Sequence, residues 1–275
     1  MSRRKTPAGF LAVLGAALLA MALVVPFASA AEEPKPGYTQ YKGCPTPSET
    51  SSVTGCFTTT IKSGNFKMGS KNVPIEKPIK LTGGYTEFGA FSFNSQGGLT
   101  KAKQKVPGGV IGLTGLTWLA EFLGIEALTL YATTELAGAP QPLAEPPFLP
   151  IKVHLENSTG VLGSNCYVGS TSNPISLHLK TGFTNPPPPN KPIKGKESEQ
   201  EFDFATGIFH LRNGTFVDNE FAAPGASGCV LTLFGFIPIS INGLVNTQSG
   251  LPSAAGNNET VQNYDAELVE RALVY

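Results

Sequence analysis

Three histidines are the side chains in this sequence with the greatest potential for metal chemistry. His154, His178 and His210 each have apolar neighbours on both sides, which places each on the polar face of a predicted strand. If these strands were adjacent, three imidazoles could bind zinc and leave one position open for a reactive water. The histidines do not occur at short metal-binding spacing. The sequence therefore favours three separate, solvated side chains over a zinc site.

Four carboxylates recur at every second position, at Glu197, Glu199, Glu201 and Asp203. On a strand this spacing places all four on one face, and carboxylate oxygens are the ligands that Ca²⁺ prefers. The segment lacks the glycine-punctuated Asp/Asn pattern of a dedicated calcium loop. We therefore expect a solvated face that protects the edge of a sheet, and we expect no bound metal or other cofactor.

No catalytic motif stands out in the chain. A serine hydrolase would carry Gly-x-Ser-x-Gly between a strand and a helix, and the nearest segments, 94–97 (NSQG) and 225–228 (GASG), lack that pattern. Paired carboxylates for glycoside hydrolysis are defined by their separation in space, so the sequence leaves them open. An enzyme is the less favoured class.

The N-terminus has the three-part layout of a secretory signal peptide. Positive charges at Arg3, Arg4 and Lys5 precede an apolar stretch over residues 10–27, which ends in the small residues Ala-Ser-Ala at 28–30. A retained membrane anchor is the alternative, and the small residues favour cleavage. No second apolar run is long enough to cross a bilayer. We expect a secreted or cell-envelope protein with no transmembrane segment after cleavage.

The charge of the expected mature chain argues against nucleic acid as a partner. The signal peptide contains three of the 20 Lys and Arg residues, so its removal leaves 17 against 20 Asp and Glu. Phosphate binding relies on clustered Lys and Arg. Envelope proteins, glycans and lipids remain as partners, and the sequence does not choose among them.

Four cysteines, Cys44, Cys56, Cys166 and Cys229, accompany the export signal. An even count in an oxidising compartment indicates disulfides. Three pairings are possible. We favour Cys44–Cys56, which brackets a turn-rich segment, together with Cys166–Cys229, which would join two β-rich regions.

Short strands dominate the predicted structure, because apolar and polar residues alternate in many short segments. Gly and Pro are abundant, at 31 and 23 residues, which is typical of turns. The sequence predicts an all-β domain, a β-sandwich or jelly-roll-like fold with one or two short apolar helices. One such helix is predicted over residues 117–123, with Trp118 in the core.

The predicted organisation has a signal peptide (1–30), a flexible N-terminal lead-in (31–43) and one β-rich domain (44–275). A proline-rich loop at 183–196 could divide the domain in two. We prefer one domain, because the favoured Cys166–Cys229 bond spans this loop.

Four segments carry a resemblance to a known group of proteins: residues 162–170 (LGSNCYVGS), 174–182, 224–229 (PGASGC) and 250–258 (GLPSAAGNN). With them, most of the mature chain resembles secreted proteins of high-GC Gram-positive (actinobacterial) bacteria that have no known activity. The resemblance implies export and is compatible with the favoured cysteine pairing. It implies no activity.

Three functional hypotheses are compatible with the sequence. The leading hypothesis is a non-catalytic β protein with a structural or binding role at the cell envelope. The second is an extracellular carrier of a hydrophobic ligand, built around the apolar segments 110–123 and 230–245, although burial of these segments in the core is favoured. The third is a secreted hydrolase that uses the histidines or a carboxylate pair.

Overall fold

The computed structural model describes residues 32–119, 128–233 and 236–275. The predicted signal peptide and the greater part of the helix predicted over residues 117–123 lie outside these ranges. Residues 32–275 form one compact unit.

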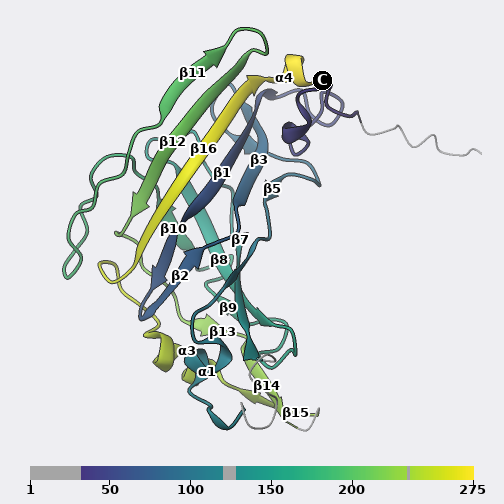
Figure 1. Cartoon of the computed structure of the whole chain (residues 1–275). Helices are drawn as coiled ribbons and strands as arrows, with labels where there is room; N and C mark the ends of the chain where they lie inside the picture. The colour runs from purple at the N-terminus through teal and green to yellow at the C-terminus, as the bar shows by residue number, and fades with distance from the viewer. Residues whose placement is uncertain (1–31, 120–127, 234–235) are drawn as a thin grey trace, which may run out of the picture. The chain divides into compact units, whose positions relative to one another are not determined.

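The larger of two main sheets is made of eight strands, and each described strand pair in it is antiparallel. Figure 1 shows its long central strands side by side. In spatial order the strands are β11 (Glu199–Asp203), β12 (Ile208–Asp218), β16 (Glu259–Glu270), β1 (Val53–Met68), β3 (Ile79–Thr86) and β4 (Phe91–Ser92), with β2 (Lys71–Ile75) paired to β1 and β5 (Gly98–Leu99) paired to β3.

The second sheet has six strands, again antiparallel throughout its described part. Its order is β13 (Ala226–Ser227), β9 (Tyr167–Val168), β8 (Phe148–Asn157), β7 (Leu130–Leu136) and β6 (Lys103–Lys105), with β10 (Ile175–His178) paired to β8. A separate two-stranded ribbon joins β14 (Val230–Leu233) to β15 (Ile237–Ser240).

Helices are few in the described ranges. They are α1 (Gly109–Thr114), α3 (Asn242–Ser249), α4 (Arg271–Val274) and a 3₁₀ turn at Thr39–Tyr41. None of them is long and apolar enough to cross a membrane. The expected all-β, sandwich-like fold is confirmed.

The two sheets enclose one large hydrophobic core. Alternation along each strand sends every second side chain inward, so Phe57 and Leu81 of the larger sheet meet Leu130, Ile151 and Ile175 of the smaller one. A smaller cluster covers one end of the larger sheet's outer face. Its members are Tyr41, Cys44, Val53, Cys56, Ile208, Val269 and Val274.

The sheets are joined directly along one side. Lys180, just after β10, and Val217 of β12 exchange two backbone hydrogen bonds of 2.9 and 2.8 Å. Next to them the buried carboxylate of Asp218 accepts hydrogen bonds from the backbone N–H groups of His178 and Glu220, at 2.7 and 2.8 Å. Burial raises the pKa of Asp218. This seam fixes the edge of one sheet against the edge of the other.

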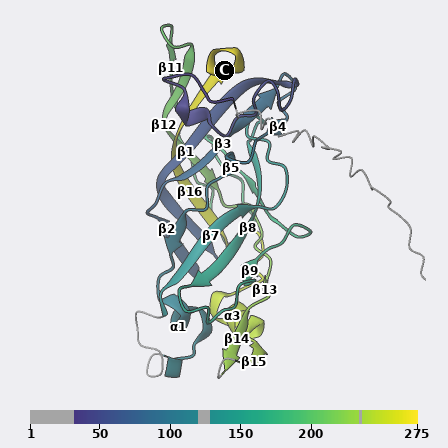
Figure 2. The ribbon, with the colours of Figure 1, turned by 90° about the vertical axis from the view of Figure 1, so that its right-hand side faces the viewer.

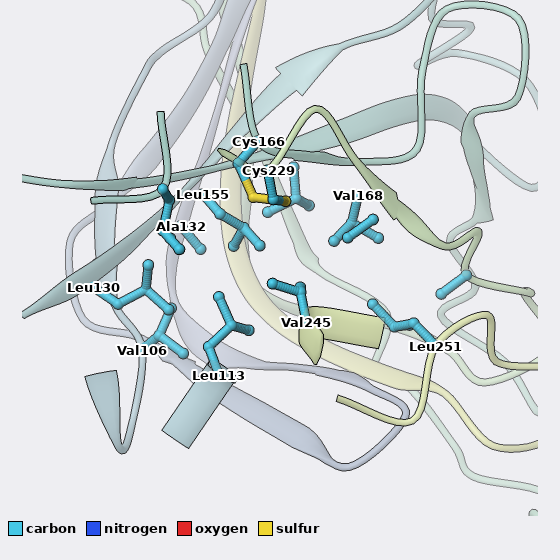
Figure 3. Close-up of a cluster of buried hydrophobic side chains, with 14 of the residues drawn as sticks. Val106, Leu113, Leu130, Ala132, Leu155, Cys166, Val168, Cys229, Val245 and Leu251 are labelled. Atoms are coloured by element: carbon cyan, nitrogen blue, oxygen red, sulfur yellow. A yellow bond between two sulfur atoms is a disulfide. The ribbon is translucent and has the colours of Figure 1, made fainter. Parts of the chain in front are cut away.

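Both disulfides form as favoured from the sequence, Cys44–Cys56 and Cys166–Cys229. All four cysteines are fully buried. Disulfides are typical of proteins that mature in an oxidising compartment. Figure 3 shows the second bond among apolar side chains that include Leu155, Val168 and Val245.

The N-terminal segment predicted as a flexible lead-in is packed over its described part. Tyr41 is fully buried in the smaller cluster, and the backbone N–H of Lys35 donates to Val274 O at 2.8 Å. The prediction used local composition alone, and the C-terminal end of the chain supplies this segment with partners that composition does not reveal.

The sequence also predicts a hairpin turn at Ser63-Gly64, and the structure contradicts it. Strand β1 continues through these residues with a register shift against β16 between Ile61 and Ser63. Gly64 has a φ of +140°, and a Cβ there would lie 1.9 Å from Val261 O, so the strand needs glycine at this position. The chain turns later, at Gly69-Ser70.

The proline-rich segment 183–196 is a loop held against the larger sheet. Thr184 and Ile193 pair across it at 2.9 Å, and Lys196 pairs with Thr215 of β12. The side chain of Asn190 donates to the backbone oxygens of Asn219 and Asn258, at 3.2 and 2.7 Å. These contacts attach the loop to the same compact unit as the rest of the chain.

Asp265 stabilises a bulge in β12, which gives a pH-dependent prediction. Desolvation opposes ionisation of this carboxyl group, but hydrogen bonds from Lys62 Nζ and from the N–H of Asn213, both 2.8 Å, lower its pKa below 3.8. We expect Asp265→Asn to lower the free energy of unfolding by about 0.5–1 kcal/mol at neutral pH.

The loss should shrink as the pH falls. A lowered folded-state pKa stabilises the fold above the unfolded-state pKa, and that contribution disappears as the carboxylate becomes protonated. Urea unfolding of both proteins at neutral pH and near pH 3 measures the difference. An equal loss at both pH values would contradict this account.

Candidate functional site

The three histidines do not converge. His154 lies in β8, while His178 of β10 stands opposite Phe148, six positions further along β8 and therefore about 20 Å away. His210 is in β12 of the other sheet. Across the described ranges no group of three or more His, Cys, Asp or Glu side chains could hold a metal ion. The hypothesis of a three-histidine zinc site was wrong.

Each histidine instead has a local contact. His154 stacks on Tyr167 with ring centroids 4.5 Å apart, and its Nε2 lies 3.1 Å from Ser164 O. The ring of His178 lies against Phe148 at 5.1 Å. His210 Nδ1 lies 3.2 Å from Glu267 Oε1. The three histidines therefore lie on three different strands, and each has its own neighbours.

The carboxylate stripe occupies an edge strand, as expected. Strand β11 is the outermost strand of the larger sheet, and both Glu199 and Glu201 are exposed. They lie near cations, with Lys196 Nζ 3.4 Å from Glu199 and Arg212 Nε 3.7 Å from Glu201.

The last carboxylate of the stripe closes a turn. Asp203 accepts hydrogen bonds from Thr206 Oγ1 at 2.6 Å and from the N–H of Ala205 at 2.9 Å, and both lower its pKa. The stripe therefore matches a solvated edge more closely than a calcium site.

The most distinctive surface lies at the end of the sandwich where α1, α3 and the β14–β15 ribbon gather, and both views of the ribbon diagram show this (Figures 1 and 2). Charged residues make up 15% of the chain, yet residues 106–119, 157–177 and 221–258 contain none. The Cys166–Cys229 disulfide and a hydrogen bond from Val230 N to Leu162 O join two of these segments. We call this region the uncharged end.

The interior of the uncharged end is well packed. Val110 and Leu113 of α1, Leu231 of β14 and Val245 of α3 are all buried in the main core. Figure 3 shows Leu113 and Val245 in the same cluster as the Cys166–Cys229 disulfide. This part of the segments 110–123 and 230–245 is core, as the sequence favoured. The carrier hypothesis, which is built around these two segments, stays a prediction.

Its outer surface is apolar and exposed. The exposed fractions are 74% for Phe236, 42% for both Ile237 and Ile239, 45% for Trp118 and 41% for Leu244. The prediction that Trp118 belongs to the core was wrong. All four residues of β15 are exposed, and Ile237 and Ile239, two positions apart, present apolar side chains to solvent on one face of the ribbon.

Two other exposed aromatic side chains, Phe204 and Phe88, lie next to acidic residues in the sequence. Phe204 is 91% exposed, but it follows Asp203 in the turn after the acidic strand, and the exposed Phe88 follows Glu87. A large apolar surface without charge marks an interaction site. Sequence reasoning noted the apolar segments but missed the run without charge from 221 to 258, which was the available signal.

Comparisons with protein-family models, with curated protein sequences and with solved structures give no significant match.

Proposed function

We propose that this chain is an exported, non-enzymatic protein of the cell envelope whose uncharged end rests on a lipid surface. The observation that carries the proposal is the β14–β15 ribbon, whose exposed Ile237 and Ile239 lie within residues 221–258, a segment that lacks charge. The part of the proposal that concerns export rests on the predicted signal peptide and on the resemblance to actinobacterial secreted proteins.

A lipid surface fits the ribbon better than a protein partner does. A protein interface surrounds its apolar centre with a polar rim and fixes its orientation with hydrogen bonds. Here the exposed Ile237 and Ile239 lie within residues 221–258, and this segment offers no charged group that could fix the orientation of a protein partner. Trp side chains, such as the exposed Trp118, are also enriched at the interface between membrane and water.

The backbone of the β14–β15 ribbon limits how deeply the ribbon can insert into a lipid bilayer. It forms a separate sheet of two strands, so both outer edges carry backbone groups without a strand partner. In hydrocarbon each unsatisfied group would cost several kcal/mol. Residence at the headgroup boundary avoids this cost and leaves the apolar side chains buried.

The expected affinity is modest. Full burial of a Phe or Ile side chain contributes about 1.5–3 kcal/mol, and the side chains considered are between two fifths and three quarters exposed. Together they supply several kcal/mol, which is on the order of reversible association with a membrane.

Flotation with phosphatidylcholine vesicles tests the proposal. We expect the wild-type protein to float with the vesicles and the Phe236→Ser/Ile239→Ser variant to lose at least about tenfold in binding, because these exposed side chains supply the apolar contact. Binding should change little with added salt, since no charge takes part.

Phe204→Ser is the matched control, because it removes a phenylalanine that is even more exposed, in the turn between β11 and β12. It should bind as the wild type does. Absence of vesicle binding by the folded wild-type protein, or an equal loss in the Phe204→Ser control, would refute the proposal. Self-association that the Phe236→Ser/Ile239→Ser variant abolishes, without vesicle binding, would assign the surface to a second copy instead.

A further inference from the structure

The two main sheets do not fill the space between them completely. Two adjoining lobes, each with a volume of about 60 Å³, lie between the inner faces. Both are lined mainly by apolar side chains. Four residues line both lobes and so connect them: Ile61, Leu99, Leu149 and Gln262.

Gln262 is the unexpected member of this lining. It is only 3% exposed, and its Nε2 donates to Thr260 Oγ1 at 3.1 Å. Thr260 Oγ1 in turn donates its single proton to Asn65 O at 3.0 Å, so it can only accept from Gln262. This orientation leaves Gln262 Oε1 as a buried acceptor that has no partner within the described residues.

A buried carbonyl oxygen without a donor is unfavourable, and native proteins almost always satisfy such groups. The other polar side chain deep in the first lobe, Gln104, is already engaged. Its Oε1 accepts from the N–H groups of Glu76 and Lys77, at 2.9 and 3.0 Å, and its Nε2 donates to Lys77 O at 2.7 Å. Gln262 Oε1 therefore lacks a hydrogen-bond donor, and the described residues around it do not supply one.

We propose that the space between the sheets binds an unbranched aliphatic chain with one hydroxyl or amide group, whose O–H or N–H donates to Gln262 Oε1. Each lobe holds about four water-sized groups, so the two together accommodate a chain of roughly eight carbons. Wide, rigid molecules such as sterols do not fit this space.

Water alone satisfies the site less well. A stably bound internal water needs two to four polar partners. Of the side chains that line the lobes, Gln262 is the one with a buried polar atom left unpaired in the described part of the chain. A ligand with an apolar body and one donor matches this lining.

The second lobe has a route to the surface. It shares Pro147, Leu179 and Phe216 with an open pocket of about 260 Å³. That pocket extends to Lys180, which forms an ion pair with Glu220. A narrow chain can enter there beside the seam between the sheets.

Two isomers test the proposal directly. 1-Octanol and heptyl methyl ether have the same atoms and similar length, but only the alcohol can donate a hydrogen bond. In an isothermal titration of the full mature protein, we expect the alcohol to bind at least about tenfold more tightly. Gln262→Leu should abolish this preference, whereas Gln200→Leu, the same change on the exposed strand β11, should keep it.

The comparison of isomers on the wild-type protein stands even if Gln262→Leu fails to fold. Equal binding of both isomers, no binding of either, or an unchanged preference in a folded Gln262→Leu variant overturns the proposal. The Phe236→Ser/Ile239→Ser variant should keep the preference for the alcohol, so this result is independent of the lipid-surface proposal.

Discussion

Replacement of Cys166 and Cys229 by serine is expected to lower the free energy of unfolding by about 4 kcal/mol. The bond closes a loop of 63 residues, and in the loop-entropy model a longer loop constrains the unfolded chain more. Both sulfur atoms are buried in the main core, so serine hydroxyl groups there would add a desolvation cost. Guanidinium unfolding of the wild-type protein and the double variant measures the difference.

The other disulfide provides the control. Cys44–Cys56 closes a loop of 12 residues and lies in the smaller cluster. Its removal is expected to cost less, about 3 kcal/mol by the same model. A larger loss for this pair than for Cys166–Cys229 would show that local packing, and not loop length, sets the contribution of each bond.

Asn258→Ala is the second change with a large expected effect, a loss of about 3 kcal/mol or more. This fully buried amide accepts from the N–H of Gly69 at 3.0 Å and donates to the backbone oxygens of Phe221, Ser253 and Ala254, at 2.9, 3.3 and 3.1 Å. Alanine would remove the side-chain partner of the Gly69 N–H and of Phe221 O and would leave a cavity beside them.

Asn257→Ala is the matched control, because the neighbouring amide is exposed and makes one hydrogen bond of 3.4 Å, to Ala254 O. It should change the stability by less than about 0.5 kcal/mol. Thermal unfolding of both variants gives the comparison. A similar loss for the two asparagines would contradict the role assigned to Asn258.

Local sequence patterns were sufficient for much of the fold. Strand β8 follows the alternation of Ile151, Val153 and Leu155, and the cysteine pairing followed from turn content and from the need to join distant β regions.

Features that depend on distant contacts were missed. Gly64 looked like a turn residue, and only its closeness to Val261 explains why a glycine stands inside this strand. Tyr41 lies in a polar segment, and only the C-terminal strand and helix explain its burial. Trp118 lies in an apolar segment, and composition does not state which apolar residues remain exposed.

The candidate sites also depended on distant contacts that local sequence patterns do not show. Whether His154, His178 and His210 converge depends on strand order, which the sequence did not contain. Gln262 was not noticed, because one glutamine within an alternating strand carries no local signal. Its orphaned acceptor becomes evident only when Thr260, Asn65 and the opposite sheet are in place.

The acidic stripe on β11 also determines how copies of this protein behave toward each other. An outermost strand offers unpaired backbone groups to any similar strand, and this is how many extracellular β proteins begin to polymerise. Two copies that met through β11 would bring Glu199 and Glu201 of one chain close to the same residues of the other, and like charges across a strand pair are destabilising. We therefore expect the acidic edge strand to oppose association of two copies through β11 at high protein concentration.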